Sequence, residues 1–407
     1  MKTAGIIAEY NPFHTGHEYQ IKYVKEKLGA DFVVIAMSGD FVQRGTPALF
    51  SKYVRAEMAL KGGADLILEL PVSSSTASAE LFAKGGVQLL DGIGVTDILC
   101  FGSECGDTRI LMELAKLLVD EPPEFQAALR LNLKEGMTFP KARSQALTEI
   151  LPEPWKYQQV LSSPNNILGI EYCKAILREK SSISPAAIKR EGNDYHEKSL
   201  AENIFPSASA IRKAIMDTHN ARTLENFLPE SCRDVFFQTV SDHNYLLEND
   251  LDLIYRYRLL QETEELLCSY LDMSHSLARR ILSCRNQYET FTQFANQLKT
   301  KDITYTRIQR ALLHMLLHIH NVPEQIPYAR VLGFRKSSAS LLGEIKKHSR
   351  IPLLTKLSDA SKVLQENPHS LDLLEETTFS SNLYENILAQ KKNASCIHEY
   401  QKQIIVL

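Results

Sequence analysis

Two histidines separated by two residues give the sharpest chemical signal in the sequence. His14 and His17 stand in the string Asn11-Pro-Phe-His-Thr-Gly-His17, between an apolar run and a helical pattern. This context predicts a turn at which the backbone N–H groups of a helix start face an anion. Gly16 would let a nucleotide approach the backbone closely, and the two imidazoles could stabilise charge on phosphate oxygens during adenylyl transfer. The alternative is that both histidines are incidental polar loop residues.

The elements that would position this string are those of a parallel sheet. Short apolar runs predict strands at 5–8, 32–36, 66–70 and 97–101. Amphipathic patterns between them predict helices at 16–28, 51–61 and 77–90. Continuous apolar strands between helices favour a sheet covered on both faces, a doubly wound α/β domain. In such a domain ligands bind beyond the carboxyl ends of the strands, which is where His14 would lie.

Beyond residue 110 helical patterns dominate the chain. A further strand is predicted at 183–189, and the stretch 224–320 is almost wholly helical in pattern. After two prolines, strands at 329–332 and 351–354 flank a helix at 337–347. We therefore expect three parts: an α/β domain at 1–220, a helical domain at 221–326, and a small C-terminal α/β segment at 327–407 that packs on the rest.

The composition excludes several classes of protein. Of 407 residues, 44% are hydrophobic and 23% charged, which is ordinary for a globular protein. The net charge of −3 gives no chain-wide footprint for nucleic acid and leaves room only for a local one. No apolar run reaches about 18 residues, so no membrane span is expected. The seven cysteines are scattered without a CxxC pair, as in a reduced cytoplasmic protein. Walker A and GxGxxG motifs are absent, which argues against a P-loop NTPase and a Rossmann dehydrogenase.

The strand–HxGH–helix arrangement resembles the nucleotidyltransferase superfamily, whose members transfer AMP or CMP from a nucleoside triphosphate. The longer strings from Gly5 to His17 and from Met37 to Pro47 resemble the bacterial tRNA(Met) cytidine acetate ligase family. The resemblance continues in the strings at 100–104, 163–172, 188–190 and 207–212. It implies that residues 1–220 form the catalytic nucleotidyltransferase-like domain. It also implies an enzyme that joins acetate to the wobble cytidine of elongator tRNA(Met), through an acetyl-adenylate and with release of pyrophosphate, to form N4-acetylcytidine.

By this resemblance, ATP lies along the first strand and the HxGH string, with both histidines on its phosphates and Gly102 beneath the adenosine. The alternative for Gly102 is a tight turn after a strand. The resemblance implies ATP contacts at Ile7, Ala8, Glu9, Tyr10, Asn11, Pro12, Phe13, His14, Thr15, Gly16, His17 and Gln20. Mg²⁺ is expected with ATP because the triphosphate charge needs neutralising. No protein cage for a metal is evident, so the nucleotide and water would carry the ion.

Five further residues could contact the nucleotide. Asn165 precedes a helix, where its amide could read an adenine edge or a ribose hydroxyl, or only cap the helix. Arg190 ends a predicted strand, where its guanidinium could grip phosphate or form a surface ion pair. Ser207, Ser209 and Arg212 resemble the second superfamily signature, SxSxxR, which at a helix start suits the β- and γ-phosphates. The alternative is a capping serine followed by a solvated arginine.

Two sets of residues could serve the other substrates. Asp40 and Arg44 follow the second strand, where Asp40 could orient an acceptor or a magnesium-bound water and Arg44 could hold acetate or phosphate, unless the loop is mere surface. Residues 276–320 hold seven lysines and arginines against two acidic residues. This basic helical face could track an RNA backbone or be an ordinary solvated face. The RNA-binding candidates are Arg279, Arg280, Arg285, Lys299, Arg307, Arg310, Arg335 and Lys336.

Three functions are open at this point. The favoured one is the tRNA-acetylating ligase, with acetate and elongator tRNA(Met) as partners and neither a membrane nor DNA. The second is an adenylyltransferase acting on a small phosphorylated molecule, which the long helical region beyond residue 220 disfavours. The third is a non-catalytic RNA-binding protein, which substitution of either histidine would separate from the others.

Overall fold

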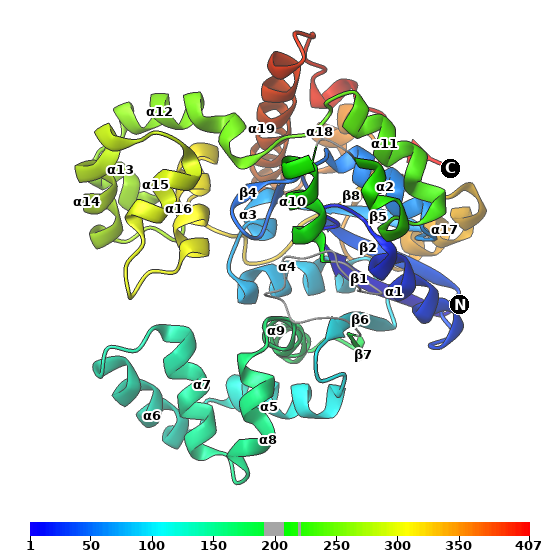
Figure 1. Cartoon of the computed structure of the whole chain (residues 1–407). Coiled ribbons are helices and arrows are strands. Elements are labelled where there is room, and N and C mark those ends of the chain that lie inside the picture. The colour runs from blue at the N-terminus through cyan, green and yellow to red at the C-terminus, as the bar shows by residue number, and fades with distance from the viewer. Residues whose placement is uncertain (191–206, 219–220) are drawn as a thin grey trace.

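The centre of the molecule is a mixed β-sheet (Figure 1). The computed structural model describes residues 1–190, 207–218 and 221–407. Within this part of the chain the strand order is β10-β8-β5-β2-β1-β6-β7, with β9 beside β8, and β3 and β4 form a separate hairpin. The strands are β1 (Thr3–Ala8), β2 (Phe32–Ser38), β3 (Phe41–Val42), β4 (Thr46–Pro47), β5 (Leu66–Leu70), β6 (Ile98–Ser103), β7 (Ser184–Lys189), β8 (Ala329–Phe334), β9 (Leu353–Leu354) and β10 (Ile405–Val406). The predicted parallel sheet is confirmed, because β5, β2, β1, β6 and β7 all run in one direction.

Helices cover both faces of this sheet, as a doubly wound fold requires. The helices are α1 (Thr15–Glu26), α2 (Lys52–Lys61), α3 (Val72–Ser75), α4 (Ala79–Gly92), α5 (Thr108–Asp120), α6 (Pro123–Lys134), α7 (Phe139–Ile150), α8 (Pro154–Ser162), α9 (Pro164–Arg178), α10 (Ala208–Thr218), α11 (Arg233–Ser241), α12 (Asp252–Gln261), α13 (Glu264–Ser269), α14 (His275–Cys284), α15 (Phe291–Leu298), α16 (Tyr305–Leu317), α17 (Ala339–His348), α18 (Ala360–Val363) and α19 (Pro368–Lys391). No helix of the described ranges has the length and hydropathy that crossing a membrane requires.

The alternation of side chains along each strand builds two cores. Ile6 belongs to the core beneath α1 and α2, whereas its neighbour Ile7 belongs to the core beneath α4, α5 and α9. Successive residues of a strand point to opposite faces, so each strand needs apolar residues throughout. A Cβ atom at Gly86 of α4 would lie 2.5 Å from Ile7, and glycine is therefore what lets α4 pack closely on β1.

The helical region has its own core and lies against the β3–β4 hairpin. Figure 1 shows α12–α16 as one group at the side of the sheet and α5–α8 as another. Leu277, Phe294 and Leu312 are buried in the core of the first group, which also takes in Phe41 of the hairpin. Gly45 has a φ of +78°, and a Cβ atom there would lie 2.4 Å from the backbone nitrogen of Arg310. The hairpin and α16 therefore meet backbone to backbone.

The C-terminal part completes the central sheet. The elements predicted there are present as β8, β9 and α17. However, β8 pairs antiparallel with β5, with Phe334 opposite Leu66, and β10 pairs with β8. The segment 327–407 therefore adds strands to the sheet of the N-terminal part, which the sequence pattern does not reveal. The predicted boundary at residue 220 lies outside the described residues.

Candidate active site

His14 and His17 lie together at the start of α1, directly beyond the carboxyl end of β1. His14 is the N-cap of the helix, and its Nδ1 accepts a hydrogen bond from Gly16 N at 3.1 Å. His17 Nδ1 accepts from His14 N at 3.3 Å, so the two side chains form a reciprocal capping box. The rings stack with their centroids 3.8 Å apart. Both histidines therefore take part in the helix start that the sequence predicts.

This capping fixes which ring nitrogen carries the proton. Because each Nδ1 accepts a backbone hydrogen bond, a neutral imidazole must carry its hydrogen on Nε2. Burial, with the charge of Arg190, lowers the pKa of His14 to about 3. Burial also lowers the pKa of His17 well below its usual value, with contributions from His14 and Arg190. At neutral pH both rings are neutral, and each has an Nε2–H left to donate to an anion at the helix N-terminus.

The aromatic residues of the string support these rings. Tyr10 and Phe13 are buried, and their rings lie 4.7 Å and 5.6 Å from that of His17. Tyr10 has a φ of +49°. Apart from the two histidines, five of the predicted ATP contacts are buried and five are partly buried. The buried ones are Ile7, Tyr10, Asn11, Pro12 and Phe13, and the partly buried ones are Ala8, Glu9, Thr15, Gly16 and Gln20.

Gly102 and Arg190 meet at the same edge of the sheet. Gly102 pairs with Ile188 across β6 and β7, and Arg190 N donates to Ser103 O at 2.9 Å. A Cβ atom at Gly102 would lie 3.3 Å from Arg190 Cγ, so a side chain there would press on the arginine. Gln20 of α1 reaches across and donates to Cys100 O at 3.1 Å. Gly102 and Arg190 thus lie together at the carboxyl ends of β6 and β7.

Asn165 and Asn166 hold the start of α9 against the end of β6. The carboxylate of Glu104 accepts from Asn165 N at 3.1 Å, from Asn165 Nδ2 at 2.8 Å and from Asn166 N at 2.8 Å. Asn166 Oδ1 accepts from Ser103 Oγ at 2.8 Å and from Cys105 N at 3.0 Å. Both asparagines lie in the first turn of α9, and the group that caps this turn is Glu104, to which the sequence analysis assigns no role. The amide side chains bond Glu104, Ser103 and Cys105 and do not cap the helix, and the contact of Asn165 with the nucleotide stays a prediction.

The SxSxxR string meets the HxGH string. Ser207 Oγ accepts from Ala210 N at 3.2 Å, as an N-cap serine does. Arg212 Nη1 donates to Asn11 O at 2.6 Å, and its Nη2 donates to Ser209 Oγ at 3.2 Å. Two motifs separated by almost 200 residues in the sequence are therefore in direct contact.

Asp40 and Arg44 have different surroundings, although both follow β2. Asp40 is buried, and its Oδ1 accepts from Lys52 N at 2.7 Å, which caps α2. Burial raises the pKa of Asp40 to about 6 against the lowering effect of Lys52. Asp40 is therefore bonded to the start of α2, and its contact with an acceptor or a magnesium-bound water stays a prediction. Arg44 is partly buried in the turn between β3 and β4.

The comparisons with known proteins agree with this geometry. Residues 1–399 match the family model described as HIGH Nucleotidyl Transferase. The chain belongs to this family. It is 38% identical to a tRNA(Met) cytidine acetate ligase of Acetivibrio thermocellus over 100% of both chains. It is 40% identical to one of Clostridium perfringens, over 94% of this chain and 95% of that one.

Solved structures resemble this HIGH nucleotidyl transferase over its whole length. The apo crystal structure of Thermotoga maritima TmcAL superimposes with a TM-score of 0.93, at 29% identity and with 100% of both chains covered. The crystal structure of TmcAL bound with alpha-thio ATP superimposes with a TM-score of 0.91, also at 29% identity and full coverage.

The basic residues predicted to contact RNA are scattered in this HIGH nucleotidyl transferase. Arg310 is mostly buried and pairs with Asp272 at 2.7 Å, so it stabilises the helical region itself. Arg335 N donates to Asp65 O, just before β5, and this places Arg335 and its neighbour Lys336 at the edge of the sheet opposite the histidines. The other candidates, all in the helical region, are Arg279, Arg280, Arg285, Lys299 and Arg307.

Several charged residues near the site were not predicted. Arg55 is fully buried and donates to Glu9 O at 2.6 Å, next to the HxGH string. Glu248, the first residue of the 3-10 helix Glu248–Leu251, is partly buried; burial raises its pKa, and the nearby charges of Arg212 and Arg44 oppose that rise. It is the acidic group that the helical region brings near the two arginines. Its sequence neighbourhood carries no motif that would single it out.

The neutral histidines predict a pH dependence of stability. Below about pH 6.5 the histidines of the unfolded chain take up protons, whereas folded His14, with a pKa of about 3, does not. Stability therefore falls as the pH drops through this window, by up to about 1.4 kcal/mol per pH unit for each such histidine. His14→Asn keeps a capping acceptor but removes one titrating group. Urea unfolding at several pH values should show a shallower pH slope for the variant, and equal slopes would contradict the assignment.

Proposed function

We propose that this chain is an ATP-dependent ligase that acetylates the wobble cytidine of elongator tRNA(Met). The proposal is carried by one observation: a stacked pair of neutral imidazoles at a helix start, with the charge of Arg190 acting on both rings and Arg212 bound to Asn11 of the same string. The likeness to tRNA(Met) cytidine acetate ligases over at least 94% of the chain supports the substrate assignment. The likeness to TmcAL, solved with alpha-thio ATP, supports ATP as the nucleotide.

The reaction needs activation of both partners. Acetate is a poor electrophile, and the exocyclic amine of cytosine is a poor nucleophile because its lone pair is delocalised into the ring. An acetate oxygen attacks the α-phosphorus of ATP, and pyrophosphate leaves with the electron pair of the broken P–O bond. The cytidine amine then attacks the acetyl carbon, AMP leaves, and the amine loses one proton. Positioning and charge stabilisation supply most of the catalysis.

Side chains and backbone N–H groups of this chain assist the first step, the formation of acetyl-adenylate. The Nε2–H groups of His14 and His17 donate to phosphate oxygens, together with the N–H groups at the start of α1. Arg190 and Arg212 add positive charge, and Arg44 is the residue to which we assign the acetate carboxylate. These donors are fixed before the reaction, so they stabilise the developing charge without reorganising.

Mg²⁺ accompanies ATP in this proposal. Within the described residues there is no group of three or more His, Cys, Asp and Glu side chains that could hold a metal ion. An ion that the triphosphate and water carry needs few protein ligands. The ion supplies charge neutralisation on the phosphates.

The tRNA approaches from the helical region. An amine in a stacked and paired base would be hidden, so the anticodon loop presents its wobble base splayed out. Arg285, Lys299 and their basic neighbours are available to follow the RNA backbone, and binding should weaken with salt. A tRNA substrate places the enzyme in the cytoplasm.

Two assays with the pure protein test this function. We expect acetate-dependent exchange of pyrophosphate into ATP, and N4-acetylcytidine in digests of elongator tRNA(Met) but not of a transcript with uridine at the wobble position. Exchange that required another acid or a phosphorylated small molecule would favour the second hypothesis of the sequence analysis. If the pure protein gave neither exchange nor modified tRNA, the proposal would be overturned.

A further inference from the structure

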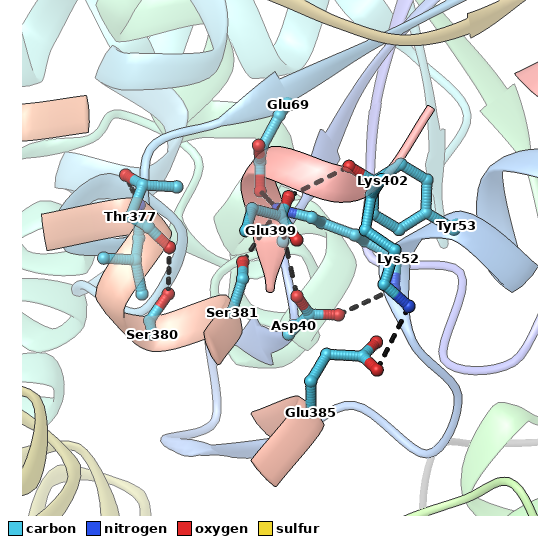
Figure 2. Close-up of polar contacts among 12 residues, drawn as sticks. Asp40, Lys52, Tyr53, Glu69, Thr377, Ser380, Ser381, Glu385, Glu399 and Lys402 are labelled. Carbon is cyan, nitrogen blue, oxygen red and sulfur yellow. Dashed lines mark hydrogen bonds and ion pairs between the residues drawn. The ribbon is translucent and has the colours of Figure 1, made fainter. Parts of the chain in front are cut away.

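A network of buried charged side chains contacts the segment 39–44, which carries Arg44. Lys52 Nζ lies 2.6 Å from Glu69 Oε1 and 2.6 Å from Glu399 Oε1. Arg330 pairs with the same two carboxylates, at 2.7 Å and 2.5 Å. Each of these four residues is at most 4% exposed, and Figure 2 shows Lys52, Glu69 and Glu399 meeting beside α19. We call these four residues the Lys52 network.

The four residues of the network come from distant parts of the chain, and one carboxylate comes from near the C-terminus. Lys52 begins α2, Glu69 lies in β5 and Arg330 in β8, whereas Glu399 begins the short 3-10 helix Glu399–Gln401 near the C-terminus. Burial alone would raise the pKa of Glu399, but the charges of Lys52 and Arg330 hold it at about 2. Without this carboxylate the two buried cations would keep Glu69 and, 3.9 Å from Lys52 Nζ, Asp40, and a poorly paired buried charge is strongly unfavourable.

The network contacts the segment 39–44, which follows β2. Asp40 accepts a hydrogen bond from Lys52 N, and its other carboxylate oxygen lies 3.9 Å from Lys52 Nζ. A Cβ atom at Gly39 would lie only 2.8 Å from Glu69 Oε1, so the network also packs against the start of the segment. The network therefore contacts the first two residues of the segment, Gly39 and Asp40.

The other end of the segment is tied to the nucleotide string. Gln43 N donates to Glu9 Oε1 at 2.9 Å, and Glu9 directly precedes Tyr10 of that string. Arg44 follows Gln43. The segment therefore runs from the Lys52 network to the edge where ATP is proposed to bind, and its path decides where the guanidinium of Arg44 lies.

We propose that Glu399 is a positioning residue for the acetate-binding side of the site. It acts through Lys52 and Glu69 on the segment 39–44, and it touches neither substrate; the inference rests on the proposed function. The donors assigned to ATP lie outside the network. Loss of the Glu399 charge should therefore weaken the use of acetate and leave the binding of ATP unchanged.

The test compares Glu399→Gln with a matched control. Gln keeps the size of the side chain and removes its charge. Glu385→Gln removes a different ion pair of the same C-terminal part, the one with Lys402 at 3.1 Å, which involves none of the four charged side chains of the network. We expect Glu399→Gln to raise the KM for acetate on the order of ten- to a hundredfold, as small misplacements of a binding group do. The Kd for ATP should stay within about twofold in both variants, and the control should keep the acetate KM of the wild type.

A general loss of folded protein would give a different pattern, with a lower kcat and unchanged KM values. Thermal unfolding establishes whether each variant is folded at the assay temperature. Should Glu399→Gln not fold, Gly39→Ala carries the test, because its methyl group presses the segment away from Glu69 while every charge stays in place. An acetate KM like that of the wild type in the folded variant, or a parallel rise in the Kd for ATP, would overturn the proposal.

A second readout separates this inference from the proposed function. Limited trypsin digestion reports how firmly the segment is held, through the rate of cleavage after Arg44. We expect faster cleavage in Glu399→Gln and Gly39→Ala than in the wild type and Glu385→Gln. If the wild type showed no acetate-dependent exchange, the proposed function would fail, and cleavage rates would still decide the positioning. Equal cleavage rates in all four proteins would contradict it.

Discussion

We expect His17→Ala to slow acetate-dependent pyrophosphate–ATP exchange by about a hundred- to a thousandfold, as loss of one preorganised donor typically does. The side chain offers one Nε2–H toward the ligand edge because its Nδ1 is already occupied by His14 N. Alanine removes that donor and also one half of the capping box. The expected effect is on kcat, because the donor stabilises charge that appears in the transition state more than charge on bound ATP.

Two further variants separate the loss of the Nε2–H donor from the loss of the capping box. His17→Asn has an amide oxygen that can still accept from His14 N, so a large defect in it would point to the missing Nε2–H. His348→Ala removes an exposed histidine of α17 and should behave as the wild type. Exchange by His17→Ala within about threefold of the wild type would contradict the assigned role. It would instead favour a protein that keeps the fold without its chemistry.

The sequence allows the prediction of those parts of the fold that depend on local patterns. The strands β1, β2, β5 and β6 of the central sheet are mostly runs of apolar residues, because a strand covered on both faces needs them along most of its length. The place of β8 could not be predicted in the same way. Its apolar run fits either direction, and pairing with β5 depends on contacts between residues more than 250 positions apart. Nothing in a local pattern distinguishes a strand that starts a new sheet from one that extends an old one.

The same distinction applies to the site. His14 and His17 are found from the sequence because the strand, the turn and the helix that position them are contiguous. Arg212 is found because a second motif marks it. Lys52 and Glu399 carry no such mark, since an isolated lysine or glutamate is usually a solvated surface residue. Only the fold shows that these charges are buried and paired.

Arg55 should be the residue of α2 whose loss most reduces the stability of the protein. Its guanidinium donates from Nε to Phe50 O at 2.9 Å, from Nη1 to Glu9 O at 2.6 Å and Ser38 O at 3.0 Å, and from Nη2 to Gly39 O. These carbonyls lie just beyond the ends of β1 and β2 and at the start of α2. Arg55→Met would take this donor from four acceptors, three of them buried and one partly buried, and each buried group left unsatisfied costs about 1–3 kcal/mol. We expect the free energy of unfolding to fall by about 3 kcal/mol or more.

Urea unfolding of Arg55→Met, Arg55→Lys and Lys61→Met tests this expectation. Lysine keeps the charge and donates up to three hydrogen bonds, but it lacks the planar fork, so Arg55→Lys should lie between the wild type and Arg55→Met. Lys61 ends the same helix and forms a partly exposed pair with Glu57 at 3.4 Å, so its loss should cost less than about 1 kcal/mol. If Arg55→Met unfolded within about 1 kcal/mol of the wild type, these carbonyls must find other donors, and Arg55 would not hold the two loops.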